Sequence, residues 1–456
     1  MKTSIEPFKI KSVEAIPITT VEEREKFLIE AFYNPFYIKS EFITIDLLTD
    51  SGTSAMSSKQ WAQIMDGDES YAGSKSYYKF ENAVKNFTNF KYIIPTHQGR
   101  AAERILFTVI SGKDKVVPNN THFDTTRGNL EFLGIEAVDL PTAIGTQTDT
   151  IADFKGNMNI EALENLILKV GKERIPLCML TITNNSGGGQ PVSMENIRET
   201  KALLKKYNIP LYLDCCRFAE NAYFIKMREK GYQNKNIKDI VTEMFSYADG
   251  CTMSAKKDGL SNTGGFIGTN DEIIADKAKN VLIVTEGFLT YGGLARRDLE
   301  ALAVGFEEVL DENYLKYRVG QVKYLGDLLT KADVPYMVPT GGHAIYLDAK
   351  RFAPHIPQHQ FPGQSIACEI YRIAGIRCVE IGSVMFGRND ENGKFIPPNM
   401  ELVRLAIPRR VYTKSHLEYT AEAVIEVYNL RDKLRGMKIT WEAPFLRHFT
   451  AKFDYI

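Results

Sequence analysis

The sequence lacks the features that would place it in several specialised classes of protein. Its 456 residues carry a formal net charge of −1, so there is no surplus of positive charge for binding nucleic acid or an anionic membrane. The six cysteines form no Cys-x-x-Cys motif, which argues against a disulfide framework and favours a reducing compartment. No apolar run is long enough to span a bilayer, and residues 1–7 contain no apolar signal core. We therefore expect a soluble, cytoplasmic protein.

Several common sequence signatures are also missing. We find no internal repeat, no low-complexity tract, no Walker loop and no dinucleotide-binding fingerprint. His355 and His359 have a spacing that suits a metal ion, but Pro357 between them would break the helix needed to align them. A surface loop is the better interpretation there. What is present is an ordinary globular composition, 44% hydrophobic and 25% charged, in a chain long enough for two or more domains.

The middle of the chain alternates between strand and helix patterns. Strands are predicted over residues 115–118, 134–140, 175–183 and 209–214, and helices over residues 159–170 and 193–207. This alternation is typical of a mainly parallel sheet covered by helices, in which ligands bind beyond the carboxyl ends of the strands. Asn185, Asp214 and Ser254 each follow such a strand. Their shared placement predicts one common site.

The two ends of the chain have a different character. Residues 1–45 resemble an N-terminal arm, which could pack on a partner subunit or on its own domain. After about residue 310, helical runs at 311–332 and 417–434 flank short strands at 344–347, 376–380 and 402–407. We therefore predict an arm with part of a small domain (1–45), a large domain (46–310) and a small α+β domain (311–456).

Residues 254–259 carry the strongest chemical signal. A strand-like run at residues 250–253 leads into Ser254 and Lys257, which have Ser-x-x-Lys spacing. Upstream, a buried strand ends at Asp214 and is soon followed by Arg217. A pyridoxal phosphate (PLP) site needs a lysine for the Schiff base, an acid for the ring nitrogen and an anchor for the phosphate. These residues supply all three.

Other interpretations of this stretch stay open at the level of the motif. Ser-x-x-Lys is common, and a pair of lysines is usually a solvated turn. The same motif begins the serine β-lactamase pattern, but the Ser-Asp-Asn and Lys-Thr-Gly motifs of that family do not occur. The turn at residues 97–99 opens a predicted helix, and it is either a second anion contact or a plain strand-to-helix turn.

Longer stretches resemble one family over nearly the whole chain. They are residues 45–53, 95–100, 189–193, 217–226, 253–258 and 447–452. In these stretches the chain is similar to the aromatic amino-acid β-lyases, the PLP enzymes that comprise tryptophanases and tyrosine phenol-lyases. The resemblance implies an α/β fold of the PLP-dependent transferase fold type I, like aspartate aminotransferase. Such a fold has a mainly parallel seven-stranded sheet in the large domain and a smaller α+β domain.

The resemblance also implies the cofactor site. Lys257 would form the Schiff base and later abstract the α-proton, and Asp214 would keep the ring nitrogen protonated. Phe123 would stack on the ring, and Arg217 and Asn185 would contact the side that carries its hydroxyl. The phosphate would be surrounded by Gln98, Gly99, Arg100, Ser254 and Lys256.

Substrate and cation contacts follow from the same resemblance. Arg404 would bind the substrate carboxylate, and Tyr71 would be the general acid near the leaving group, supplied by a neighbouring subunit. The remaining substrate contacts would be Thr49, Ser51, Asp124, Asn185, Ile381, His448 and Phe449, with Asp124 and His448 also taking part in catalysis. Gly52, Glu69 and Asn262 would hold a monovalent cation, usually potassium. The resemblance further implies a homotetramer built from catalytic dimers.

Three positions favour tryptophan over tyrosine as the substrate. The tyrosine-cleaving branch has an arginine, a threonine and a phenylalanine where this chain has Ile381, Asp124 and His448. A leaving phenol oxygen needs a cationic donor, which Ile381 is not, whereas Asp124 can accept from an indole N–H. Residues 453–456 and Asn262 resemble the phenol branch more closely, and the pair Cys215–Cys216 is unusual for either branch.

The expected reaction is the β-elimination of L-tryptophan to indole, pyruvate and ammonia. The alternatives are cleavage of L-tyrosine to phenol, another lyase or aminotransferase of the same fold, and a PLP-binding protein without catalysis. Cys216 is expected near the cofactor, which predicts sensitivity to thiol reagents.

Overall fold

The computed structural model describes residues 5–456, and residues 1–4 of the predicted arm lie outside the described part. The chain forms two compact units. Unit 1 comprises residues 1–50, 146–152 and 319–456, and unit 2 comprises residues 51–145 and 153–318. The segment 146–152, which the sequence had assigned to the large domain, belongs to unit 1, where Thr148 donates to Asp348 Oδ2 at 2.5 Å. The division into an arm and two domains stays a prediction.

Unit 2 is built on seven strands. They are β2 (Tyr92–Thr96), β3 (Val116–Asn119), β4 (Glu136–Asp139), β5 (Cys178–Thr181), β6 (Leu211–Asp214), β7 (Gly250–Ser254) and β8 (Gly265–Thr269). Five of them form one sheet in the order β2-β8-β7-β6-β5, in which β5, β6 and β7 run parallel and β8 runs antiparallel to both neighbours. The parallel pair β3-β4 lies beside β5, because the Asn119 side chain bonds Thr181 Oγ1 at 2.9 Å.

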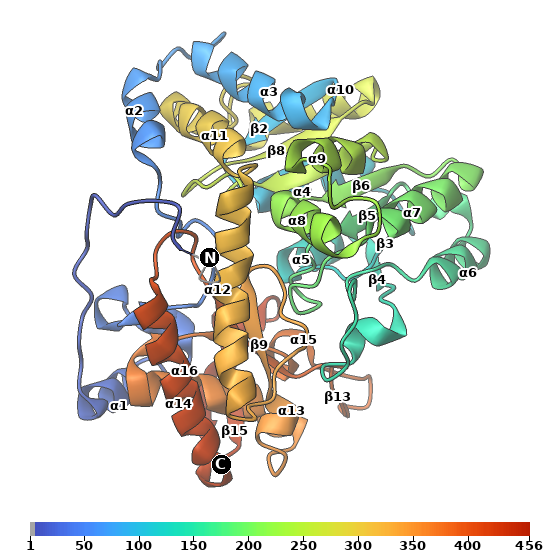
Figure 1. The fold of residues 1–456 in the computed structure, drawn as a ribbon. Coiled ribbons are helices and arrows are strands. Elements are labelled where there is room, and N and C mark those ends of the chain that lie inside the picture. The colour runs from blue at the N-terminus through green and yellow to red at the C-terminus, as the bar shows by residue number, and fades with distance from the viewer. Residues whose placement is uncertain (1–4) are drawn as a thin grey trace. The chain divides into compact units, whose positions relative to one another are not determined.

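Helices cover both faces of this sheet (Figure 1). They are α2 (Ser58–Asp66), α3 (Lys75–Thr88), α4 (Gly99–Ile110), α5 (Asp124–Phe132), α6 (Ile160–Val170), α7 (Met194–Tyr207), α8 (Phe218–Arg228), α9 (Ile237–Ser246), α10 (Glu272–Thr285) and α11 (Arg296–Glu308). Because side chains alternate along a strand, neighbours on β8 enter two different cores. Ile267 packs with α4, α5 and α10, whereas Phe266 packs against Phe80 of α3 and Phe306 of α11.

Unit 1 is an α+β unit. Its elements are α1 (Val21–Glu30), β1 (Ile45–Asp46), β9 (Ala344–Asp348), α13 (Ala349–Phe352), α14 (Pro362–Ala374), β10 (Ile376–Arg377), β11 (Val379–Ile381), α15 (Ser383–Phe386), β12 (Arg388–Asn389), β13 (Phe395–Ile396), β14 (Leu402–Ala406), α16 (Lys414–Asn429), β15 (Met437–Trp441) and β16 (Lys452–Tyr455). The long helix α12 (Glu312–Lys331) begins in unit 2 and ends in unit 1. The central sheet of unit 1 is antiparallel, in the order β11-β14-β9.

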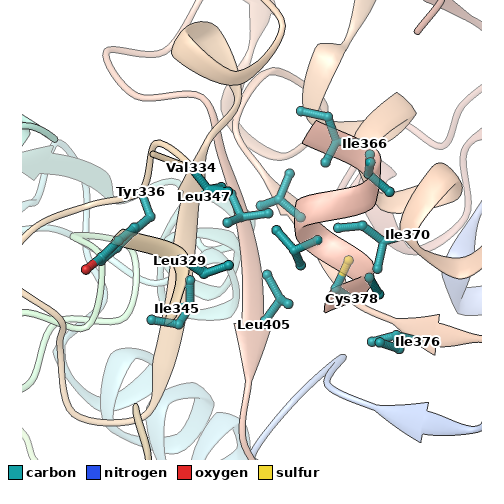
Figure 2. Close-up of a cluster of buried hydrophobic side chains, with 14 of the residues drawn as sticks. Leu329, Val334, Tyr336, Ile345, Leu347, Ile366, Ile370, Ile376, Cys378 and Leu405 are labelled. Carbon is teal, nitrogen blue, oxygen red and sulfur yellow. The ribbon is translucent and has the colours of Figure 1, made fainter. Parts of the chain in front are cut away.

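The core of unit 1 lies on one face of this sheet (Figure 2). Leu347 of β9 and Leu405 of β14 are buried there together with Ile370 of α14. The opposite face carries a second apolar cluster, which includes Tyr346 and Ile381. Several sequence predictions differ from the structure at element ends. The apolar pattern of residues 43–48 predicts a strand, but only Ile45–Asp46 forms one, and the last long helix ends at Asn429 instead of near 434.

Much of the N-terminal arm packs on its own unit. Arg24 of α1 donates from Nε to Arg372 O at 2.8 Å and from Nη2 to Ile373 O at 2.6 Å, at the end of α14. Leu28 joins a buried cluster with Tyr371 and Phe453. Within residues 5–456, none of the helices combines the length and apolar character needed to cross a membrane.

Candidate active site

Five strands of unit 2 carry the predicted cofactor residues, and the predicted substrate residue Asp124, at or just beyond their carboxyl ends. The parallel strands β5, β6 and β7 end on the same side of the sheet, and β2 points the same way because β8 is antiparallel to both β2 and β7. Strand β3 ends beside the end of β5, as the bond between Asn119 and Thr181 requires. The residues that follow these five strand ends are Gln98, Gly99 and Arg100; Phe123 and Asp124; Asn185; Asp214 and Arg217; and Ser254, Lys256 and Lys257.

The loop that carries Lys257 is fixed at both ends. Ala255 N donates to Gly264 O at 2.9 Å, and Asp258 N donates to Cys216 O at 3.2 Å. The carboxylate of Asp258 accepts from the backbone N of Ala219 at 2.8 Å, in the first turn of α8. A lysine that must reach a reactive carbonyl gains from such a rigid loop, because little side-chain and backbone freedom remains to be lost.

An anion site lies at the start of α4. Helix α4 begins at Gly99, and the side chain of its N-cap residue, Gln98, makes no capping hydrogen bond. No side chain therefore caps the backbone N–H groups of Gly99 and Arg100 at the start of this helix, and uncapped groups of this kind favour an anion. The Ser254 hydroxyl is buried and has no hydrogen-bond partner among the described residues. A phosphate oxygen would supply the acceptor that this buried donor needs.

The approach of α4 to Ser254 requires a glycine. A Cβ added at Gly99 would lie 2.5 Å from Ser254 Cβ and 2.8 Å from Ser254 Cα. Backbone atoms cannot give way as a flexible side chain can. We predict that Gly99→Ala lowers the affinity for PLP at least about tenfold and destabilises the fold by about 1–3 kcal/mol. Fluorescence titration with PLP and thermal melting measure both effects.

Gly112→Ala is the matched control for this variant, because it lies just beyond the other end of α4. There the nearest atom to an added Cβ is Lys115 Cε at 3.2 Å, the end of a flexible side chain. We expect Gly112→Ala to bind PLP like the unmodified chain. A Gly99→Ala protein with unchanged PLP affinity would contradict the assignment of this cradle.

Positive charge gathers beside the anion site. Lys256 Nζ donates to Gln98 Oε1 at 3.1 Å. Burial and the neighbouring charges of Lys257 and Arg100 together lower the pKa of Lys256 to about 8. A bound phosphate would offset this mutual repulsion. The donor set therefore fits a phosphate group, as the predicted cofactor requires.

Asp214 and Lys257 act on the same neighbouring groups. Asp214 is buried at the end of β6, and Cys216 Sγ lies 3.0 Å from its Oδ1. Asp214 raises, and Lys257 lowers, the pKa of both Cys216 and Glu103. The acid and the amine are thus close enough to the same side chains to serve one ligand.

Glu103 lies near the predicted site residues Asp214, Lys257 and Asp124, and the sequence did not reveal it. It lies on α4, is nearly buried and accepts from Thr126 Oγ1 at 2.5 Å. Burial and the nearby carboxylates of Asp214 and Asp124 together raise the pKa of Glu103 to about 8. The carboxyl group is therefore neutral at pH 7. A glutamate in the second turn of an ordinary helix carries no sequence signal for this, since the shift comes from tertiary burial.

Glu103 predicts a pH-dependent stability. Below about pH 4.5 the carboxyl is protonated in both states, whereas between about 4.5 and 8 only the folded state keeps the proton. Folding then takes up a proton, so stability falls as pH rises through this range, on the order of a few kcal/mol in total. We expect Glu103→Gln, which cannot ionise, to lose that part of the decline in Tm between pH 5 and 8, measured without added cofactor.

The control for this prediction is Glu161→Gln on the exposed first turn of α6, which should follow the unmodified chain at every pH. Parallel melting curves for Glu103→Gln and the unmodified chain across pH 5–8 would show that Glu103 is not held neutral.

The other predicted site residues of unit 2 are placed as follows. Asp124 is buried at the first position of α5, where Oδ1 accepts from Thr125 N at 2.5 Å. Phe123 precedes it and is half-buried. Asn185 and Arg217 are both buried, and the Arg217 carbonyl accepts from Thr183 Oγ1 at 3.1 Å. Each position agrees with a role at the carboxyl ends of the strands, and these roles stay predictions.

The predicted cation residues fall into two places. Asn262 Nδ2 donates to Gly52 O at 3.0 Å and to Ser54 O at 3.1 Å, so Gly52 and Asn262 lie together. Gly52 has φ +77, and a Cβ there would lie 2.9 Å from Asn262 O. Glu69 instead pairs with Arg297 at 2.8 Å. Among the described residues, no group of three or more His, Cys, Asp or Glu side chains is arranged to hold a metal ion.

Tyr71 lies on the surface of unit 2. It is 64% exposed and packs against Phe288 and Tyr291, with ring centroids 5.4 and 5.5 Å away. A hydrogen bond with Tyr291 raises the pKa of the Tyr71 phenol. Neither of these aromatic neighbours is a predicted cofactor residue. The contacts within one chain therefore give no support for Tyr71 as the general acid of the site in the same chain. Ser51 begins unit 2 and is half-buried.

Unit 1 carries the other predicted substrate residues. Arg404 lies at the centre of β14, paired in register with Tyr346 and Val379. Its Nη2 donates to Leu48 O at 2.9 Å, next to Thr49. Because side chains alternate along β14, Arg404 shares a sheet face with the cluster that contains Ile381. Arg404 and Ile381, which were both predicted to bind substrate, therefore lie on the same face of the central sheet of unit 1.

Phe36 connects Ile381 with the C-terminal segment. It packs on the apolar cluster that contains Ile381, and its ring lies 4.9 Å from Phe449 and 6.1 Å from His448. Arg447 ties the same regions together, because its guanidinium donates to the carbonyls of Ser383, Val384 and Gly387 at 2.7–2.8 Å. The sequence predicted no role in the site for Phe36 or Arg447.

The chain matches one protein family over most of its length. The family is described as beta-eliminating lyase, and the match covers residues 46–423. A tryptophanase from Salinibacter ruber is 57% identical over 99% of this chain and 95% of that protein. A tryptophanase from Hyphomonas neptunium is 54% identical over the full length of both. A tyrosine phenol-lyase from Nostoc punctiforme is 49% identical over 98% of this chain and 96% of that protein.

Solved structures share the fold at low sequence identity. A structure of SPT with PLP has a TM-score of 0.59 at 13% identity, covering 90% of this chain and 97% of that one. The SepCysS–SepCysE N-terminal domain complex has a TM-score of 0.55 at 15% identity, covering 86% and 96%. The predicted fold class, the PLP-dependent fold type I, is thereby confirmed. Together, the family match and the full-length relatives establish that the chain belongs to the beta-eliminating lyase family.

Proposed function

We propose that this chain is a PLP-dependent lyase that cleaves L-tryptophan to indole, pyruvate and ammonia. The observation that carries the proposal is the shared strand edge of unit 2, where Asp214 and Lys257 lie beside the anion cradle of Gly99 and Ser254. The tryptophanases at 57% and 54% identity support tryptophan as the substrate.

The cofactor supplies an electron sink for the negative charge that develops at the substrate α-carbon. The carboxylate of Asp214 keeps a proton on the ring nitrogen, so that the sink stays cationic. Lys257 Nζ removes the proton from Cα, and Arg404 binds the substrate carboxylate through charge-assisted hydrogen bonds. The indole must leave with a proton on its ring carbon, and Tyr71 is the acid that we assign to this step.

Three residues select the leaving ring in this proposal. Asp124 accepts the indole N–H, and His448 orients that polar end. Ile381 presents an apolar surface to the ring, because it is itself buried in an apolar cluster. A mismatched hydrogen bond at a buried group costs about 1–3 kcal/mol, which is enough to separate indole from phenol.

Tyrosine cleavage is the second candidate. The tyrosine phenol-lyase at 49% identity supports it, and so do Asn262 and residues 453–456, which resemble that branch. We rank it lower because Ile381 cannot donate a hydrogen bond to a leaving phenol oxygen.

Further parts of the proposal concern the assembly and its ions. The exposed Tyr71 supports a homotetramer built from catalytic dimers, in which Tyr71 serves the site of a neighbouring subunit. The contact between Gly52 and Asn262 supports a monovalent cation, such as potassium, bound there, and Glu69 would have to leave Arg297 to join it. All six cysteines are free thiols, which supports a cytoplasmic location.

The deciding experiment incubates the PLP-loaded protein separately with tryptophan and with tyrosine, without an added keto acid. We expect indole and pyruvate in equal amounts from tryptophan. Phenol and pyruvate from tyrosine at a higher kcat/KM would favour the second candidate. Dependence on an added keto acid would indicate an aminotransferase, and a protein that binds no PLP would overturn the proposal.

A further inference from the structure

Cys216 lies between the two ends of the predicted cofactor site. Its Sγ is 3.0 Å from Asp214 Oδ1, at the end of β6. The same sulfur accepts from the backbone N of Ser254 at 3.3 Å, at the end of β7. Cys216 is the partly exposed cysteine of the chain, whereas the other five are buried. One side chain therefore contacts both the residue assigned to the ring nitrogen and the residue assigned to the phosphate.

The thiol is the donor in its contact with Asp214. A carboxylate oxygen can only accept, so the hydrogen must come from sulfur. Burial raises the pKa of the Cys216 thiol, and the charge of Asp214 adds to the increase, although Lys257 opposes it. The thiol thus keeps its proton at neutral pH. The hydrogen bond from Ser254 holds the sulfur in place while it donates.

The neighbouring cysteine shows that this arrangement is specific. Cys215 is fully buried, and its thiol donates to the backbone O of Thr252 at 3.3 Å. Cys215 therefore faces the main chain of β7, whereas Cys216 faces the carboxylate of Asp214. Two adjacent thiols of the same chemistry have different environments because consecutive side chains point in different directions beyond the end of β6.

We propose that Cys216 is a positioning residue whose thiol fixes the orientation of the Asp214 carboxylate for the cofactor's ring nitrogen. A donor on Oδ1 restricts rotation of the carboxylate about its Cβ–Cγ bond. The carboxylate is then ordered before the cofactor binds, which reduces the entropy lost on binding. This inference rests on the proposed cofactor role of Asp214, and it concerns a residue that the proposed function leaves without a task.

The first test measures PLP affinity for Cys216→Ala and Cys216→Ser by equilibrium titration. We expect Cys216→Ala to bind PLP about three- to tenfold more weakly, the size of one typical hydrogen bond lost, because a thiol is a weak donor. Cys216→Ser keeps a donor at the same position and should recover most of the affinity. Cys178→Ala is the control, because its thiol lies on β5 and bonds the backbone O of Met179.

A double-mutant cycle with Asp214→Asn separates positioning from general packing. If Cys216 acts through the carboxylate, Cys216→Ala should change PLP affinity in the natural background and leave it unchanged in the Asp214→Asn background. A packing defect would appear equally in both. Equal losses in the two backgrounds, or no loss in either, would overturn the inference.

A second measurement does not depend on whether the alanine variant folds. The rate of iodoacetamide labelling at Cys216 is followed by peptide mass spectrometry in the cofactor-free protein. Asp214→Asn removes a neighbouring negative charge, so the thiol should ionise more readily and react severalfold faster at pH 8. An unchanged rate would contradict the contact.

The test distinguishes this inference from the proposed function. If the natural chain binds no PLP at all, the proposed function fails. If the natural chain binds PLP and Cys216→Ala binds it equally well, only the role of Cys216 fails.

Discussion

Lys257→Ala is expected to lower kcat for tryptophan cleavage at least about a thousandfold, because it removes both the covalent attachment and the base for the α-proton. The loop around Lys257 is tied to β6, α8 and Gly264 by backbone hydrogen bonds, so truncation of the side chain should leave the fold intact. Steady-state production of indole and pyruvate measures the effect, and melting curves check the fold.

The neighbouring Lys256 is the alternative amine that could carry the cofactor. Burial, Lys257 and Arg100 together lower the pKa of Lys256 to about 8, so this amine is also available as a nucleophile. Borohydride reduction of the PLP-loaded protein, followed by peptide mapping, shows which lysine carries the cofactor. We expect the label on Lys257 and no label in Lys257→Ala.

Lys205→Ala, on the exposed last turn of α7, is the control and should keep full activity. Retained elimination in Lys257→Ala, or a label on Lys256 in the natural chain, would transfer the assignment to the other amine.

Ile381→Arg combined with Asp124→Thr is expected to move the preference from tryptophan towards tyrosine. The arginine supplies a cationic donor for a phenol oxygen, and the threonine removes the carboxylate acceptor for an indole N–H. At about 1–3 kcal/mol for each of two mismatched hydrogen bonds, the ratio of kcat/KM for tryptophan over tyrosine should fall at least about thirtyfold. Competition assays with both substrates measure this ratio.

The burial of Ile381 decides which control that experiment needs. Ile381 is buried with Tyr346 and Leu402, so an arginine there brings a charge into an apolar cluster and should lower Tm. Ile381→Met, similar in volume but without a donor, separates loss of packing from gain of the donor and should leave the ratio unchanged. A folded double variant with the original ratio would show that these positions do not select the ring.

The strand-end placement of the site could be read from the sequence. Asp214 and Ser254 follow short, buried apolar runs, and the period of those runs indicates strands whichever tertiary contacts form. In a mainly parallel sheet the carboxyl ends of the strands lie on the same side, so the local patterns were enough to predict that Asn185, Asp214 and Ser254 lie in one region. The sequence evidence for Gly99 was weaker, because a lone glycine does not reveal which backbone segment approaches it.

The ends of elements were less accessible to sequence reasoning. The strand predicted over residues 43–48 shrinks to Ile45–Asp46, because β1 pairs only with the two-residue strand β10. The membership of residues 146–152 in unit 1 depends on hydrogen bonds from Thr148 and Val338, which are far apart in the sequence. No local pattern encodes such a contact.

By itself, the sequence determined the α/β alternation, the lysine and acid of the candidate site, and the family. Hydrophobic period and motif spacing are properties of neighbouring residues, and they survive without knowledge of the fold. Only the tertiary structure decided that Glu103 is held neutral, that Cys216 donates to Asp214, and that Glu69 pairs with Arg297. These properties arise from burial and from contacts between distant segments, so they exist only once the chain has folded.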